Sequence, residues 1–106
     1  MYNGLMRKNM KGIFIVYDQA YNMDIADALQ TFGVRGFTMW QDIAGQGSDN
    51  GEPHLGNHAW PAMNNAMLTF VPDDKVTEIL NKIKAMDEET PDLGLRAFVW
   101  NVERHY

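Results

Sequence analysis

Segments with strand character and segments with helical character alternate along this chain in an order that few folds accommodate. Four stretches are apolar and rich in β-branched or aromatic residues, which is typical of strands: residues 12–17, 34–43, 66–71 and 95–102. Two others place apolar side chains on one helical stripe: residues 23–32 and 73–86. The predicted order is therefore strand, helix, strand, strand, helix, strand.

This order predicts an α+β, ferredoxin-like βαββαβ fold, with a four-stranded antiparallel sheet and two helices on one face. Residues 13–17 and 98–100 are largely apolar at consecutive positions, so both faces of the sheet are expected to be buried. The helices of a single chain cover only one face. We therefore expect self-association to cover the other.

The ends of the two predicted helices carry capping signals. Asn22 is the expected N-cap of the first helix, and Gly33 is its expected C-terminal stop. Asp73, after Pro72, is the expected cap of the second helix. Residues 87–94 are expected to form an acidic, solvated turn. Neither Asp73-Asp74 nor the acidic residues 87–89 are expected to bind a cation.

Composition narrows the classes of function. The 106 residues suit one domain over residues 10–106, with residues 1–9 as an extension without clear periodicity. The net charge is −5 and the basic residues are scattered, so binding of nucleic acid is not expected. No apolar run approaches a membrane span, and no secretory signal is evident. The chain has no cysteine, which excludes thiolate metal sites and fits a cytoplasmic location.

Residues 45–65 are rich in glycine, proline, asparagine and histidine and are predicted to be a long loop. The loop opens on Gly45-Gln46-Gly47, whose backbone N–H groups could hold an anion. A plain turn or a strand bulge would use the same glycines. The sequence leaves both interpretations open.

The same loop holds the best metal candidates, His54 and His58. Imidazole suits Zn, Cu or Ni, but two ligands do not make a site. Glu52, Asp49 or His105 would have to complete it. The alternative is two loop histidines that bond to backbone or solvent.

Contact with a partner is a further possible role of this loop. Trp60, with Glu52, could dock a partner protein, and the Trp60 ring could instead stack on an adenine. Alternatively, Trp60 packs the loop back on the body of the domain.

Catalytic residue sets are missing from the sequence. It has no cysteine nucleophile, no Gly-x-Ser-x-Gly and no P-loop with its lysine. A small hydrolase of this fold would need a phosphate-binding arginine with a catalytic asparagine, and no such pair is evident. We therefore expect a binding or regulatory protein and not an enzyme.

The chain resembles the PII signal-transduction family, and most closely its shorter PII-like relatives. The resemblance covers roughly residues 10–104, through these pieces in order: Met10-Lys11, Asp24-Ile25, Ala28-Leu29, Gly36-Phe37-Thr38, Gly45-x-Gly47, Gly51, Val71-Pro72-Asp73-Asp74, Val76, Phe98-Val99 and Val102. The later phosphate-binding turn departs from the family pattern, with only Gly94 and the basic Arg96 near family positions, and so do two positions of the loop. Ser48 stands where the family has a basic residue, and Asp49 where it has a glutamine used with the metal and 2-oxoglutarate.

The resemblance implies a homotrimer whose sheets face inward, with adenine nucleotides (ATP, ADP or AMP) or another anion in clefts between subunits. It implies that the 45–65 loop contacts a target protein, which would be a transporter, an enzyme or a regulator. The residues that would line the cleft are Thr38, Gly45, Gln46, Gly47, Gly94 and Arg96. The alternative is a divalent-metal-binding trimer of the cation-tolerance type, which shares this architecture and would use His54 and His58.

Overall fold

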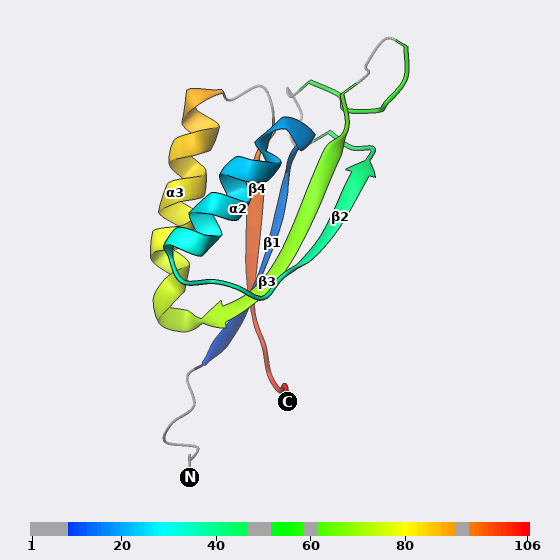
Figure 1. Cartoon of the computed structure of the whole chain (residues 1–106). Helices are drawn as coiled ribbons and strands as arrows, with labels where there is room; N and C mark the ends of the chain where they lie inside the picture. The colour runs from blue at the N-terminus through cyan, green and yellow to red at the C-terminus, as the bar shows by residue number, and fades with distance from the viewer. Residues whose placement is uncertain (1–8, 47–51, 59–61, 91–93) are drawn as a thin grey trace.

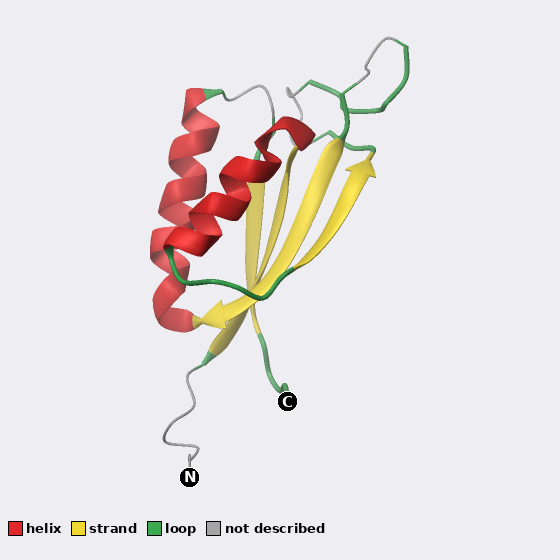
Figure 2. Ribbon diagram, in the orientation of Figure 1, coloured by secondary structure: helices red, strands yellow, loops and turns green. Residues whose placement is uncertain are grey.

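The computed structural model describes residues 9–46, 52–58, 62–90 and 94–106. Its strands are β1 (Met10–Asp18), β2 (Thr38–Ile43), β3 (Asn64–Pro72) and β4 (Arg96–Asn101), and its helices are α2 (Asn22–Thr31) and α3 (Val76–Glu89). The strands form one antiparallel sheet in the order β2-β3-β1-β4. Both helices cover the same face of the sheet (Figures 1 and 2). The predicted ferredoxin-like α+β fold is confirmed.

The hydrophobic core lies between the sheet and the two helices. It contains alternate residues of the central strands, which point to one side because side chains alternate along a strand. Its buried members are Ile13, Ile15, Tyr17, Ile25, Leu29, Met67, Val71, Ile79, Ile83, Met86 and Leu95. Neither described helix is long and apolar enough to cross a membrane.

The C-terminal stop of α2 is confirmed at Gly33. Its φ is +79°, a conformation that glycine adopts without strain. The N–H of Gly33 donates to the Gln30 carbonyl, and the N–H of Val34 donates to the Leu29 carbonyl, both at 2.9 Å. This pair of bonds is a Schellman motif, which satisfies the carbonyls that the helix end leaves free.

The predicted N-cap of α2 is wrong. Tyr21 occupies the cap position and makes no side-chain capping bond, while Asn22 is the first residue of the helix. The side chain of Asn22 points instead to the core side, where its Oδ1 accepts a hydrogen bond of 2.8 Å from the Tyr17 hydroxyl. A buried tyrosine needs a partner for its hydroxyl, and this need outweighs capping here.

The predicted cap of the second helix is also wrong. Asp73 begins a short 3-10 turn, and α3 starts only at Val76 with no side-chain capping bond. The acidic residues 87–89 are not a solvated turn either, because α3 continues to Glu89. Asp87 Oδ2 lies 3.0 Å from Arg96 Nη1, and this ion pair ties the last turns of α3 to β4.

Strand β2 begins four residues later than the predicted 34–43 strand. Residues 34–37 carry the chain from α2 to the edge of the sheet (Figure 1). The Gly36 carbonyl accepts a 2.6 Å bond from the side-chain hydroxyl of Thr69 in β3, in place of a backbone ladder bond. The end of β2 at Ile43 matches the prediction, and the other strand boundaries differ from the predicted ones by one or two residues.

Candidate functional site

The long loop after β2 is closed at its base by backbone hydrogen bonds. The N–H of Gly45 donates to the His54 carbonyl at 2.8 Å, and the N–H of His54 donates to the Gly45 carbonyl at 2.7 Å. A second closure follows, where the N–H of Gly56 donates to the Ala62 carbonyl at 3.2 Å. The loop therefore leaves the sheet from a paired base.

His54 sits at this base with its ring inside the protein. The residue is 1% exposed. Its Nδ1 lies 2.5 Å from Asn64 Oδ1, and its Nε2 lies 3.4 Å from Asp18 Oδ2. Asp18 ends β1 and Asn64 begins β3, so the ring joins the loop to the ends of the two central strands.

The structure does not bring the two predicted metal ligands together. His54 is buried against Asp18 and Asn64, whereas His58 is exposed. Glu52 and His105 are exposed, and Asp49 and Trp60 lie outside the described residues. Within the described ranges, no group of three or more His, Cys, Asp or Glu side chains is placed to hold a metal ion.

At Gly45, its first residue, the glycine turn has no free backbone N–H for an anion. The N–H of Gly45 is already bonded to His54, so it is not available to an anion. A Cβ at Gly45 would lie 2.8 Å from Asn64 Nδ2, which explains why a glycine stands there. Gln46 is exposed, and Gly47 falls outside the described residues. An anion at this turn would therefore have to use the amides that follow Gly45.

The remaining predicted ligand residues lie near strand ends. Gly94 is buried with φ +75°, just before β4. Arg96 Nη1 bonds to Asp87 Oδ2 at 3.0 Å and to the Leu95 carbonyl at 2.7 Å, so this arginine is held in place. Thr38 is exposed at the first position of β2.

Gly45 and Arg96 lie at the same end of the sheet but on opposite edges. Gly45 follows edge strand β2, and Arg96 begins edge strand β4. Neighbouring strands are about 4.8 Å apart, so the two edges are separated by roughly 14 Å. One small ligand does not bridge that distance across the sheet of a single chain.

The sheet face opposite the helices, which we call the open face, carries large aromatic side chains. Trp40, Phe70, Phe98 and Trp100 are 44%, 51%, 57% and 43% exposed. Phe70 and Trp100 meet edge to face with ring centroids 6.3 Å apart. The Trp100 ring lies over Gly12, where an added Cβ would come within 2.5 Å of it. The open face is thus an apolar surface that the described part of the chain leaves uncovered.

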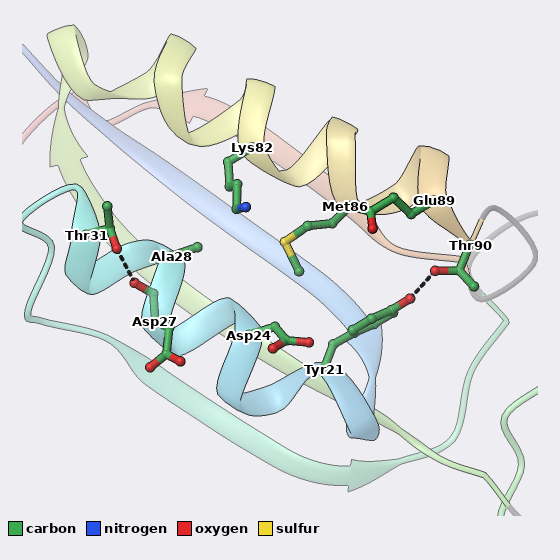
Figure 3. A pocket seen from close by; sticks show the side chains of 9 residues that line it. All are labelled: Tyr21, Asp24, Asp27, Ala28, Thr31, Lys82, Met86, Glu89 and Thr90. Atoms are coloured by element: carbon green, nitrogen blue, oxygen red, sulfur yellow. Dashed lines mark hydrogen bonds between the residues drawn. The ribbon is translucent and has the colours of Figure 1, made fainter.

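A hollow of about 390 Å³ lies between the two helices, and none of the predicted site residues that the structure describes lines it (Figure 3). The carboxylates of Asp24, Asp27 and Glu89 and the amine of Lys82 line it. A hydrogen bond between the Tyr21 and Thr90 hydroxyls closes one end.

Sequence reasoning missed three polar residues at the loop base: Asp18, Asn64 and Asn65. All three are less than 8% exposed. Asn65 Oδ1 accepts a 3.1 Å bond from the N–H of Asp42, a bulged residue of β2 with φ +57°. One signal was present, because two asparagines in succession are unusual in a strand. Buried asparagines need partners, and here they set the direction in which β2 enters the loop.

A sheet with helices on one side, an apolar open face and a paired loop base is the framework of a small α+β binding domain. Comparison with known proteins identifies the family to which this domain belongs. The family model for nitrogen regulatory protein P-II matches residues 10–106, and the chain belongs to that family. Proteins of this family are signalling regulators. Among curated proteins, no sequence matches the chain.

Solved structures of P-II-like proteins share the fold. CPII from Thiomonas intermedia K12, bound to ADP and bicarbonate, superposes with a TM-score of 0.71 at 22% identity, over 88% of this chain and 85% of that one. The same protein bound to ADP, AMP and bicarbonate gives 0.72 at 21% identity, with the same coverage. The GlnK–ATP complex of B. subtilis gives 0.65 at 15% identity, over 89% of this chain and 82% of that one.

Proposed function

We propose that this protein is a homotrimeric P-II-type regulator that binds an adenine nucleotide or another anion between neighbouring chains. The state of that site is passed to a target protein through the 45–65 loop. The observation that carries the proposal is the open face, because its aromatic side chains lie on a sheet whose other face is already fully used by the helices.

The open face supports an assembly of identical chains. Exposed apolar patches of this kind mark sites of association in soluble proteins. Burying aromatic rings provides much of the free energy of such interfaces. A trimer with its sheets facing inward would remove Trp40, Phe70 and Phe98 from water at once.

The placement of the predicted ligand residues supports a site between chains. Gly45 and Arg96 lie on opposite edges of one sheet, so a cleft that uses both needs β2 of one chain beside β4 of another. The solved relatives bound to ADP, AMP, bicarbonate or ATP make an adenine nucleotide the first ligand to test.

The loop supports contact with a partner protein. Beyond its paired base it presents the exposed side chains of Glu52, Leu55 and His58. Ligand bound beside the base would bias the position of these residues, and a partner that contacts them would sense the difference.

The test is calorimetric titration with ATP, ADP and AMP, each with and without bicarbonate and a divalent metal, together with light scattering for mass. We expect a trimer that binds at least one nucleotide at micromolar concentration. Thr38→Ala, at the predicted ligand residue that begins β2, should weaken that binding, and Asp27→Asn, on the helical face, should not. A trimer without nucleotide binding would contradict the ligand, and a monomer would contradict the whole proposal.

A further inference from the structure

We propose that His54 is a positioning residue that latches the base of the 45–65 loop to the sheet and so holds the glycine turn in place for its ligand. The latch consists of His54, Asp18 and Asn64. The part that concerns ligand binding rests on the proposed function. The mechanical part, which is that His54 fixes the loop base on the sheet, does not rest on it.

The contacts of the ring carry this inference. Nδ1 forms a hydrogen bond of 2.5 Å with Asn64 Oδ1, and Nε2, which has no hydrogen-bond partner among the described residues, lies 3.4 Å from Asp18 Oδ2. The other carboxylate oxygen of Asp18 accepts a 2.8 Å bond from the N–H of Ala20, which fixes the carboxylate. The imidazole therefore packs beside a carboxylate whose orientation is already fixed by the backbone.

Burial makes the arrangement specific. His54, Asp18 and Asn64 are 1%, 7% and 2% exposed. Polar groups removed from water must be paired to offset the loss of their hydration. If the loop shifted its base by one residue, the exposed Leu55 would replace His54, Asn64 Oδ1 would lose its hydrogen bond, and the Asp18 carboxylate would face an apolar side chain. The loop thus has one favoured register on the sheet.

The latch acts on the glycine turn through the backbone. His54 shares two hydrogen bonds with Gly45, at 2.8 and 2.7 Å, and Asn64 fills the space beside the Gly45 Cα. Fixing the ring therefore fixes Gly45, and with it the direction in which Gln46 leaves the sheet. Preorganising a site in this way strengthens binding because less ordering is left to the ligand.

Hydrogen exchange of the Gly45 amide, followed by NMR, tests the mechanical part. In His54→Ala we expect this amide to exchange roughly 10 to 100 times faster than in the parent, the effect of losing a hydrogen bond to a charged or buried group. The amides of Ile13 and Ile15 in the core should keep their rates. His58→Ala, which changes the exposed histidine of the same loop, should leave Gly45 unchanged.

Two milder variants keep the test valid if His54→Ala does not fold. Asp18→Asn keeps the oxygen that caps Ala20 but removes the charge beside Nε2, and His54→Gln keeps a donor at this place. Both should accelerate Gly45 exchange by less than His54→Ala. Unchanged Gly45 exchange in all three variants, or equal acceleration at Gly45 and Ile13, would overturn the latch.

Titration with ADP tests the positioning part separately. His54→Gln should bind ADP more weakly than the parent by a factor of about ten, while His58→Ala binds as the parent does. If the parent binds no nucleotide, the proposed function fails and the latch is judged by exchange alone. If Gly45 exchange accelerates in His54→Gln but ADP affinity stays at the parent value, His54 does not position the site.

Discussion

The two faces of the sheet use the same strands and similar residues, but their exposure is opposite. Ile13 and Ile15 of β1 face the helices and are fully buried, whereas Phe70 and Phe98 on the open face are 51% and 57% exposed. Neighbouring side chains of a strand point to opposite faces. Along the central strands, one residue therefore stabilises the fold, and the next is left exposed on the open face, where we propose that another chain covers it.

This difference gives each face its own measurable consequence. Substitutions on the helix side should change the free energy of unfolding of every species. Substitutions on the open face should first change the mass of the particle in solution. The predictions that follow separate the two, in order of expected effect.

Phe98→Asp should abolish the proposed trimer. It places a charge on the apolar open face, where association would remove that charge from water without a partner. Light scattering at micromolar protein should give the mass of one chain. Met23→Asp is the matched control, because Met23 is even more exposed, at 73%, but lies on α2. A trimer in Phe98→Asp would mean that the open face is not the interface.

Ile15→Ala should lower the free energy of unfolding by about 2 to 5 kcal/mol, the usual effect of emptying a fully buried aliphatic site. Urea unfolding measures it. The same substitution in the Phe98→Asp background should cost a similar amount, because Ile15 faces the helices and not another chain. A loss that vanishes in that background would show that Ile15 acts through the assembly.

Gly12→Ala should disturb the open face without emptying the core. The new methyl group would come within 2.5 Å of the Trp100 ring, so the ring must move from Gly12 and from its contact with Phe70. Overpacking of this kind costs about 1 to 3 kcal/mol. Tryptophan fluorescence and the concentration at which the trimer dissociates should both change. Gly36→Ala, with nothing within 4 Å of its added Cβ, is the control and should change neither.

The fold could be predicted from the sequence because it depends on local patterns. The apolar stretches of β1 and β3 and the helical stripes give the order of elements, and Gly33 marks a helix end whose geometry only glycine adopts easily. These signals act over a few residues. They do not depend on what lies across the sheet.

The loop base could not be predicted because its partners come from distant segments. His54 was a metal candidate on sequence spacing alone, and nothing near it indicates that Asp18 and Asn64 surround its ring. Asn22 failed as a cap for the same reason, since it bonds to Tyr17 and to Asn65 across the fold. Where a polar residue has several possible partners, the tertiary structure decides which of them it bonds.

The smallest predicted effect concerns that polar network on the helix side. Burial raises the pKa of the Tyr17 hydroxyl above its ordinary value of 10.0, partly opposed by a hydrogen bond from Asn65. The unfolded chain then releases this proton more readily than the folded chain. The stabilising effect is fully present below about pH 10 and is lost as the pH rises through the raised pKa.

Tyr17→Phe isolates this contribution. The variant loses the bond to Asn22 and should be less stable than the parent at about pH 8, where a lost hydrogen bond costs about 1 kcal/mol. Between about pH 8 and pH 11, however, its free energy of unfolding should fall less than that of the parent, because no buried hydroxyl remains to ionise. Urea unfolding at both pH values measures the two slopes. Equal alkaline losses in parent and variant would mean that Tyr17 ionises as easily in the folded chain as in water, and that the helix side of the sheet is less closed than its buried side chains indicate.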